Sequence, residues 1–422
     1  MVKKVCVVGL GYIGLPTAGL LAKNGFQVHG VDVNIHTVEK ISQGEVHITE
    51  PDLDQVVKEA VQCGLLRAST IPAEADVYIL AVPTPFQENN KPDLTYVEQA
   101  VKAVIPYLRP GNLVILESTS PVGTTERIAD WILEARRDLS ISDSLYAAYN
   151  RIFVSYCPER VLPGQILREL VENDRIVGGI DEASTRWTAD FYRHFVKGAI
   201  LETNARTAEM AKLTENSFRD VNIAFANELS LICDHLEIDV WELIRLANRH
   251  PRVNILQPGP GVGGHCIAVD PWFLVDAAPE QAKLIHTARI VNDSKPWYVA
   301  EKVIQVAAKL KSPGIACLGL SFKANIDDLR ESPALAIVEH LAKAAAAYLY
   351  VAEPHIKELP VSLQYGNVQF CEAEEAVRQA DIVLLLVNHD AFGPIGPELL
   401  EDKIVVDTRG FFMHPSRVEA RV

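Results

Sequence analysis

One cysteine of the sequence lies in a segment rich in glycine and proline, residues 259 to 273, which reads GPGVGGHCIAVDPWF. The glycines can adopt dihedrals that are closed to other residues and let a ligand approach the main chain, while the prolines stiffen the segment. A preorganised loop of this kind around Cys266 indicates a thiol that does covalent chemistry. The alternative is that Cys266 is a small buried hydrophobic residue, as most cysteines outside disulfides are.

A second group of reactive types recurs at helical spacing. Lys212, Asn216 and Arg219 stand at i, i+4 and i+7, so a helix would carry an amine, an amide and a guanidinium on one face. Such residues usually form a solvated face. Asn216 argues against this interpretation, because asparagine is unfavourable inside a helix but useful as a preorganised hydrogen-bond donor.

Two further pairs of residues combine charge with a position at the end of an element. Glu159 and Arg160 follow a strand predicted over 152–157, where parallel sheets usually place their chemistry, although a surface ion pair is the alternative. His250 and Arg252 stand directly before the glycine-rich segment. They could bind a phosphate or be surface charge.

The elements that must position these residues begin with a nucleotide-binding pattern. The apolar run 4–8 predicts a buried strand, and it leads into GLGYIG, a helix over about 15–24 and a second strand over 27–31. Asp32 ends that second strand, at the distance where a carboxylate binds an adenosine ribose. The whole setting, and not the glycine motif alone, predicts a dinucleotide site, and the acid favours NAD over NADP.

Each glycine of this motif has a separate physical role. We expect Gly9 to make the tight turn, Gly11 to admit the pyrophosphate and Gly14 to let the helix pack on the strand. The N-terminus of the helix then faces the phosphates.

Hydroxyl-rich turns follow two more predicted strands, 77–82 and 113–117. Ligands of an open parallel sheet lie beyond the carboxyl ends of its strands, which makes Thr84, Thr119 and Thr125 candidate cofactor contacts. Threonine before a helix also caps its N-terminus, so helix capping remains an equal alternative.

The rest of the chain predicts a helical connector and a second α/β unit. Apolar residues at helical spacing over 205–248 and 284–311 indicate long helices. From residue 314 onward, strands alternate with helices, as in a second parallel sheet. Because GxGxxG and an acid at the end of its second strand are not recognised there, we expect a nucleotide domain that does not hold a dinucleotide. Its candidate anion contacts are Lys323, Arg330 and Arg409.

Bulk properties set limits on partners and compartment. The chain of 422 residues is too long for one ordinary core, and 48% of it is hydrophobic without an apolar run long enough to span a membrane. A net charge of −15 argues against general binding of nucleic acid. Seven scattered cysteines show neither a disulfide framework nor metal spacing, so no metal is expected. The N-terminus is too short for a signal peptide, and the expected compartment is the cytoplasm.

These patterns predict an α/β protein with two Rossmann-like, doubly wound parallel-sheet domains joined by a central helical region. The expected parts are an NAD-binding domain over 1–203, a helical connector over 204–311 that carries the cysteine loop, and a second Rossmann-like domain over 312–422.

Six separated motifs in one order resemble the UDP-glucose/GDP-mannose dehydrogenase family along nearly the whole chain. They are GLGYIGLP, STSPVGTTE, CPERVLPG, AEMAKLTENSFRDVN, GPGVGGHCIAVDP and GLSFKANIDDLRESP. Within the family, the third and fifth motifs are most similar to the branch that oxidises UDP-N-acetyl-D-mannosamine for surface polysaccharides.

The resemblance implies two successive NAD-dependent oxidations at C6 of a UDP-sugar, through a thioester on Cys266. Lys212 and Asn216 match positions that stabilise oxyanions. Asp270 and Glu159 match positions that manage water and protons, and Thr119 matches one near the reacting carbon. A homodimer through the central helices is also implied.

The same resemblance assigns the remaining residues. The substrate contacts would be Arg160, Val161, Arg219, His250, Arg252, Gly263, Phe322, Lys323 and Arg409, and Arg330 would reach the cofactor. The nucleotide-binding pattern and the hydroxyl-rich turns give the other cofactor contacts, which are Gly9, Gly11, Tyr12, Ile13, Gly14, Asp32, Thr84 and Thr125. One departure is Val269, where UDP-glucose enzymes usually carry a lysine before the aspartate; it argues for an N-acetylhexosamine over glucose.

Three alternative functions remain, and they differ in the role that Cys266 would have. A UDP-N-acetylglucosamine or UDP-glucose 6-dehydrogenase would keep the same mechanism. A single-step hydroxy-acid dehydrogenase would explain the glycine motif with Lys212 and Asn216, but not the second α/β domain or the cysteine loop. A non-catalytic NAD-binding protein is the third alternative.

Overall fold

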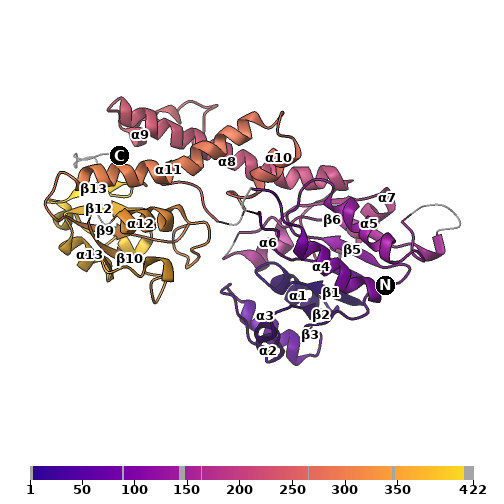
Figure 1. Ribbon diagram of the computed structural model, residues 1–422. Helices are drawn as coiled ribbons and strands as arrows, with labels where there is room; N and C mark the ends of the chain where they lie inside the picture. Colours follow the sequence, from indigo (N-terminus) through magenta and orange to yellow (C-terminus); the bar gives the residue numbers. More distant parts are fainter. Residues whose placement is uncertain are drawn as a thin grey trace. The chain divides into compact units, whose positions relative to one another are not determined.

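The computed structural model describes residues 3–87, 90–141, 148–162, 164–264, 266–344 and 347–412 (Figure 1). By its internal packing the chain forms two compact units. The first comprises Met1–Glu215 with Trp272–Ala277, and the second comprises Asn216–Pro271 with Ala278–Val422. The expected division at residues 203 and 311 stays a prediction.

An eight-stranded sheet forms the centre of the first unit, in the order β3-β2-β1-β4-β5-β6-β7-β8. Its strands are β1 (Lys4–Val8), β2 (Gln27–Val31), β3 (Leu66–Ser69), β4 (Val77–Leu80), β5 (Leu113–Leu116), β6 (Phe153–Tyr156), β7 (Arg175–Gly179) and β8 (Ile200–Asn204). The first six strands follow the order of a doubly wound nucleotide-binding sheet. β7 pairs with β6 in antiparallel fashion, so the expectation of a parallel sheet holds only up to β6 and again between β7 and β8.

Both faces of this sheet are covered by helices. They are α1 (Gly14–Lys23), α2 (Ile35–Ser42), α3 (Leu53–Gln62), α4 (Thr95–Val104), α5 (Thr124–Ala135), α6 (Ile166–Glu172) and α7 (Glu182–Tyr192), with the short 3₁₀ turns Ile105–Tyr107 and Ala148–Asn150. Alternate residues of β1 enter different cores: Val5 and Val7 pack on one face, and Cys6 and Val8 on the other. A strand that buries both faces has no polar alternation, which is why these strands are continuous apolar runs in the sequence.

Four helices separate the two sheets along the chain: α8 (Ala205–His235), α9 (Val240–Ala247), α10 (Asp270–Ala277) and α11 (Lys283–Ala307). The long helix α8 begins in the first unit and continues into the second. Within the second unit, Asp220 of α8 and Arg289 of α11 form a buried ion pair of 2.6 Å. Asn292 of α11 donates to the same carboxylate at 2.8 Å. Polar groups therefore help to fix the register between α8 and α11.

The second unit contains a five-stranded parallel sheet in the order β11-β10-β9-β12-β13. Its strands are β9 (Gly314–Leu318), β10 (Tyr348–Ala352), β11 (Val368–Phe370), β12 (Ile382–Leu385) and β13 (Ile404–Asp407), and its helices are α12 (Pro333–Ala344), α13 (Ala373–Gln379) and α14 (Pro397–Leu400), with 3₁₀ turns Val361–Leu363 and Asp390–Phe392. Two Rossmann-like sheets with helices between them confirm the predicted fold class.

Three strands of the first sheet are absent from the sequence prediction: β3, β7 and β8. Each lacks an uninterrupted apolar run, and the edge strand β8 is exposed or half-buried along its whole length. Within the described ranges, no helix has the length and apolar character that crossing a membrane requires.

Candidate active site

The glycine turn after β1 has the geometry that a dinucleotide site requires. Gly9 has a φ of +91°, and a Cβ there would come within 2.4 Å of the Ala81 carbonyl oxygen. A Cβ on Gly14 would come within 1.7 Å of the Gly9 carbonyl oxygen. At Gly11, by contrast, no described atom lies within 4 Å of the added carbon. Gly9 and Gly14 are therefore required by internal packing, whereas Gly11 leaves open space for a ligand.

Asp32 lies half-buried at the end of β2, beside this turn. Its Oδ2 accepts the backbone N–H of Leu10 at 3.0 Å, and its Oδ1 accepts that of Asn34 at 2.9 Å. Because a carboxylate oxygen has more than one lone pair, capacity remains for a ribose hydroxyl. Tyr12 is exposed and Ile13 half-exposed at the start of α1, which places them at the surface of the same turn.

Threonines at the ends of β4 and β5 contact each other. Thr84 Oγ1 donates to the Thr119 carbonyl oxygen at 2.5 Å, which ties the two turns together. Both residues are half-buried, so they lie at the edge where a doubly wound sheet binds its ligand.

Thr125 has a different environment. It is fully buried in the first turn of α5, and its backbone N–H and its hydroxyl both donate to Glu209 Oε1, at 2.8 and 2.6 Å. Glu209 also accepts the Gly123 N–H, so this carboxylate caps the helix N-terminus. The helix-capping alternative for Thr125 is wrong, because Gly123 is the N-cap of α5 and the Thr125 hydroxyl donates to Glu209. The cofactor contact of Thr125 stays a prediction.

Glu159 is a buried carboxylate. Its Oε2 pairs with Arg175 Nη1 at 2.9 Å, and its Oε1 accepts the backbone N–H of Arg160 at 2.6 Å. The Arg160 guanidinium pairs with a different carboxylate, that of Glu215, at 2.7 Å. The expected alternative of a surface pair between Glu159 and Arg160 is therefore wrong, because each side chain has another charged partner. Val161 lies half-buried against the core of the first unit.

Cys266 is exposed, on a turn that leads into α10. Its carbonyl oxygen accepts the backbone N–H of Asp270 at 2.9 Å, so the two residues are adjacent along one turn. The Asp270 carboxylate, which is buried, accepts a short hydrogen bond from the side-chain amide of Asn216 on α8. The structure thus brings together Cys266, Asp270 and Asn216.

The other two residues of the predicted helix face, Lys212 and Arg219, lie on the same continuous helix α8. Lys212 precedes Asn216 by one turn and is half-buried, and Arg219 follows it and is exposed. An amine and an amide on one face of a helix can stabilise negative charge on a substrate oxygen.

Glycines before Cys266 pack against two predicted substrate residues within the second unit. A Cβ on Gly263 or Gly264 would come within 3 Å of Phe322, and one on Gly259 would come within 2.7 Å of the Arg409 guanidinium. The Gly263 position is also blocked by the Glu331 carbonyl oxygen, at 2.3 Å. These glycines are therefore required for close packing of the loop on the turns after β9 and β13.

The start of the cysteine loop is anchored to the central helices. The Gly259 N–H donates to Asn227 Oδ1 at 2.9 Å, and Asn227 donates to Asn292 Oδ1 at the same distance. Asn292 in turn binds Asp220. A chain of buried side-chain amides thus holds the loop on α8 and α11.

The remaining cationic candidates lie in the second unit, and all of them except Arg409 are exposed. Lys323, His250 and Arg252 lie at the surface. Arg330 is exposed and pairs with Asp328 at 2.6 Å. Arg409 is half-buried and donates to the Leu386 carbonyl oxygen at 3.1 Å, and burial, partly offset by Asp407, lowers its pKa to about 10.

Glu353 overturns one expectation. We expected no acid at the end of the second strand of the C-terminal sheet, but Glu353 follows β10 directly. Its Oε2 accepts the N–H groups of Leu320 and Ser321, at 2.7 and 3.1 Å, as Asp32 accepts that of Leu10 in the first sheet.

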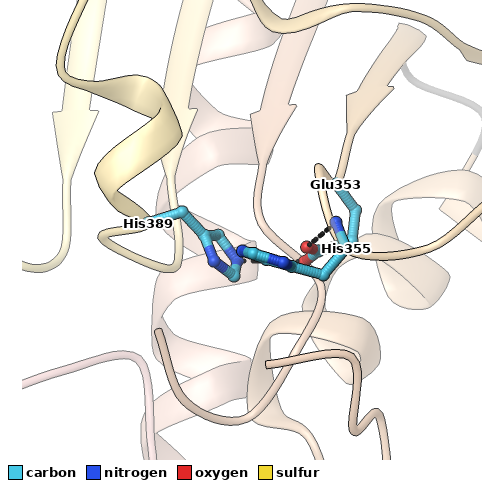
Figure 2. A group of neighbouring side chains, drawn as sticks. All are labelled: Glu353, His355 and His389. Atoms are coloured by element: carbon cyan, nitrogen blue, oxygen red, sulfur yellow. Dashed lines mark hydrogen bonds and ion pairs between the residues drawn. The ribbon is translucent and has the colours of Figure 1, made fainter. Parts of the chain in front are cut away.

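Unlike Asp32, Glu353 is bound by a histidine (Figure 2). His389 Nδ1 accepts the backbone N–H of Asn325 at 2.9 Å, so the proton of the neutral ring is on Nε2, which lies 3.1 Å from Glu353 Oε2. Burial alone would raise the pKa of Glu353, but the hydrogen bonds from His389 and the backbone lower it below its ordinary value.

His355 completes a cluster in which ligand-type atoms of Glu353, His355 and His389 lie within 4.8 Å of one another. A metal-bound histidine usually donates its second ring N–H to an oxygen acceptor. His389 Nδ1 accepts a hydrogen bond instead, which would leave the metal a protonated Nε2. The geometry is that of a hydrogen-bonded anchor for the turn after β9.

Comparison with known proteins agrees with this geometry over the whole chain. Three parts match the UDP-glucose/GDP-mannose dehydrogenase family: its NAD binding domain over residues 3–196, its central domain over 206–294 and its UDP binding domain over 316–414. The chain belongs to this family.

Similar proteins cover nearly the full length of this dehydrogenase. The NDP-N-acetyl-D-galactosaminuronic acid dehydrogenase of Ralstonia nicotianae is 58% identical over 97% of the chain and 96% of its own length. The UDP-N-acetyl-D-mannosamine dehydrogenase of Campylobacter jejuni is 56% identical over 95% of the chain and 98% of its own. The structure of the UDP-N-acetyl-mannosamine dehydrogenase of S. aureus has a TM-score of 0.87 and 41% identity, and covers 100% of this chain and 97% of that one.

The dehydrogenase therefore uses NAD, and the turn after β1 has the residues to hold it. Gly11 leaves space for the pyrophosphate and Asp32 keeps capacity for the ribose. Bound NAD would supply the hydride acceptor for oxidation of a nucleotide sugar.

Sequence reasoning missed three buried residues of the dehydrogenase that adjoin Glu159: Glu117, Arg175 and Tyr192. Glu117 ends an apolar run that was recognised as a strand, and a charged residue at that point was a usable signal. Arg175 and Tyr192 gave no signal, because arginine and tyrosine are normally interpreted as surface or packing residues.

Proposed function

We propose that the chain oxidises C6 of a UDP-N-acetylhexosamine to the carboxylic acid in two NAD-dependent steps, with UDP-N-acetyl-D-mannosamine as the first candidate substrate. The observation that carries the proposal is the grouping of exposed Cys266 with Asp270 and Asn216. A thiol on a glycine loop, beside a carboxylate and an amide, is suited to hold an aldehyde covalently between two oxidations. The product would serve surface polysaccharide synthesis.

The first oxidation removes a hydride and a proton from the C6 alcohol and leaves an aldehyde. Cys266 Sγ adds to the aldehyde carbon and forms a thiohemiacetal, and loss of a second hydride and proton gives the thioester. Water then cleaves the C–S bond, restores the thiol and releases the acid. One alcohol, one water and two NAD⁺ give one carboxylate, two NADH and three protons.

Each of the proposed catalytic residues would take one part of this sequence of steps. Lys212 and Asn216 stabilise the negative charge that develops on the C6 oxygen. Asp270 and Glu159 orient water and move protons, and Thr119 lies near the reacting carbon. The pairing of Glu159 with Arg175 holds this carboxylate in one position.

The UDP-sugar would be bound by the polar and glycine-rich surface of the turns described above. The proposed contacts are Arg160, Val161, Arg219, His250, Arg252, Gly263, Phe322, Lys323 and Arg409. The contact between Phe322 and the glycine loop supports this set, because it couples the UDP-binding turn to the segment that carries Cys266. Arg330 is proposed to reach the cofactor.

A UDP-N-acetylgalactosamine substrate is the second candidate. It is favoured by the 58% identity to a relative named for N-acetyl-D-galactosaminuronic acid, against 56% for one named for N-acetyl-D-mannosamine. Both sugars carry a 2-acetamido group. Val269, which is buried beside Asp270, replaces a lysine of UDP-glucose enzymes and supports either N-acetylhexosamine over glucose.

A homodimer through the central helices is also proposed. Phe218, Phe225 and Ile232 follow one another every seven residues along α8 and are 69%, 54% and 46% exposed. An apolar stripe of this kind is costly in water and typical of a helix that packs against a partner.

The test measures NADH formed per sugar consumed for UDP-ManNAc, UDP-GalNAc, UDP-GlcNAc, UDP-glucose and GDP-mannose, side by side. We expect two NADH per sugar and the highest kcat/KM with a UDP-N-acetylhexosamine. A stoichiometry of one would contradict the thioester mechanism and support a single-step dehydrogenase. Failure to reduce NAD with every sugar would support a non-catalytic NAD-binding protein.

A further inference from the structure

A closed group of ionisable side chains lies in the first unit at the ends of β5 and β6 and the start of β7. Glu117, Glu159 and Arg175 are 1%, 8% and 3% exposed, and Tyr192 of α7 is fully buried beside them. Thr119, proposed to lie near the reacting carbon, is two residues after Glu117. The group therefore contains one residue of the proposed mechanism, Glu159, and adjoins another, Thr119, along the chain.

The two carboxylates of the group differ in how many of their oxygens are bound by a charged group or a backbone N–H. Glu159 uses both oxygens, one for Arg175 at 2.9 Å and one for the Arg160 N–H. Glu117 Oε1 accepts the Tyr192 hydroxyl at 2.6 Å. Among the described residues, Glu117 Oε2 and Thr17 Oγ1 of α1 are buried and bind no other group, and the interaction between them lowers the pKa of Glu117. A hydrogen bond between these two side chains can satisfy both atoms with the carboxyl group ionised or protonated.

Charge balance within this buried group favours the protonated form of Glu117. The group contains one permanent cation, Arg175, and two carboxylates, so ionising both would leave one uncompensated negative charge in the interior. Burial raises the pKa of Glu117 to about 7, against the lowering effect of Arg175 and together with repulsion by Glu159. Burial also raises the pKa of Cys157 to about 12 and that of Tyr192 well above its ordinary value, so neither ionises in the neutral range.

We propose that Glu117 is a positioning residue, which in its protonated form leaves Arg175 to Glu159 alone and in its ionised form competes for Arg175 and disturbs Glu159. The inference rests on the proposed function, because it concerns how Glu159 is held for proton and water transfer. Catalysis would then decline as the proton leaves Glu117, although Glu117 itself touches neither substrate nor cofactor.

The kinetic experiment compares the pH dependence of kcat for the wild-type protein and Glu117→Gln, with saturating NAD and UDP-sugar. We expect the wild type to show a falling step with a midpoint near the Glu117 pKa, and the variant to lack this step because its amide cannot ionise. Superimposable profiles would overturn the proposal. A uniform loss across all pH values, with the step retained, would also overturn it and indicate a structural role only.

Tyr192→Phe provides a second, independent test of the same group. The Tyr192 hydroxyl stabilises the ionised form of Glu117 and so lowers its pKa. Removing the hydroxyl should raise that pKa, and the step should move to higher pH without disappearing. A step that stays in place would contradict the assignment to Glu117.

Thermal unfolding measures the same proton without any substrate. The folded pKa of Glu117 lies above its unfolded value, so the cost of ionising the buried group is absent below pH 4.5, grows towards pH 7 and is complete above it. Glu117→Gln should therefore raise Tm relative to the wild type at pH 8, and this gain should shrink as the pH falls towards 5. A gain that is independent of pH would overturn the proposal.

Infrared difference spectra separate failure of this inference from failure of the proposed function. Between pH 6 and pH 8, the wild type should lose a protonated-carboxyl band that Glu117→Gln lacks. If this band is seen but no UDP-sugar is oxidised, the proposed function fails while the buried proton stands. If UDP-sugar is oxidised with two NADH and the band is absent, the role of Glu117 fails alone.

Discussion

Exposure distinguishes the cysteines of this chain. Cys266 and Cys63 are exposed, whereas Cys6, Cys157, Cys233 and Cys317 are buried. Only Cys266 of the exposed pair lies on a turn that also carries a buried carboxylate, Asp270. Cys266 is therefore not the buried hydrophobic residue of the alternative interpretation, and its catalytic role stays a proposal.

Replacement of this thiol tests its chemical role. Cys266→Ala should lower the rate of carboxylate formation by at least about 10³-fold, because no thioester can form. The affinity for NAD should stay unchanged. Product analysis and NAD titration by calorimetry measure the two effects. Cys63→Ala is the matched control and should retain full activity. Acid production by the Cys266 variant at the wild-type rate would remove the thiol from the mechanism.

Two glycines of the nucleotide turn should respond oppositely to the same substitution. Gly14→Ala forces a Cβ to within 1.7 Å of a backbone oxygen and should lower the free energy of unfolding by about 1–3 kcal/mol. Gly11→Ala meets no described atom within 4 Å, so Tm should be preserved while NAD affinity falls by roughly ten-fold or more. Denaturation curves and NAD titrations separate the two. Equal loss of stability in both would contradict the packing argument.

At the scale of elements, the sequence predicts what apolar runs and glycine turns determine. The strands Lys4–Val8 and Gln27–Val31 were predicted with the bounds that the structure has, because each is an apolar or alternating run between clear breaks. The edge strand β8 has a polar sequence and forms only because β7 supplies a hydrogen-bonding partner. Pairing of that kind is not visible in a local pattern.

Site residues whose partners lie far away in the sequence were equally difficult to predict. The types and spacing of Lys212 and Asn216 indicated a charge-stabilising face. The pairing of Asn216 with Asp270, 54 residues later, depends on how the chain returns to α8. Arg175 could not be assigned to Glu159 for the same reason, since their adjacency is created by the antiparallel pairing of β6 and β7.

The turn after β9 should depend on Glu353. Its carboxylate binds two backbone N–H groups of that turn and His389, and Ser321 Oγ also donates to the Lys323 carbonyl oxygen at 2.7 Å. Glu353→Gln replaces acceptor capacity with donor groups and should raise the KM for UDP-sugar by about ten-fold, with the KM for NAD unchanged. Initial-rate kinetics with each substrate varied in turn provide the measurement.

Glu374→Gln is the control for charge alone, because it removes a carboxylate from an exposed ion pair with Arg378. It should change neither KM. A rise in the KM for NAD as large as that for UDP-sugar in the Glu353 variant would indicate general misfolding and contradict a local role of the turn.

At the scale of the whole molecule, the apolar stripe on α8 predicts the assembly. Phe225→Asp places a charge in the middle of the stripe and should convert a dimer to a monomer, because burying an unpaired carboxylate in an interface is unfavourable. Light scattering coupled to gel filtration measures the mass. Val361→Asp, at an apolar position outside α8 that is 83% exposed, is the control and should leave the mass unchanged. A dimeric Phe225 variant would place the interface elsewhere.

The acids that end β2 and β10 have a consequence for how the two sheets become ordered. The carboxylate after β10 is saturated by the protein's own groups, so its turn is complete before any ligand arrives. The carboxylate after β2 retains capacity, and its turn is complete only with NAD. Amide hydrogen exchange should therefore be slow after β9 in the unliganded protein and slow after β1 only once NAD is added. In the second sheet, hydrogen bonds from the protein itself thus take the place that a ligand would have in the first sheet.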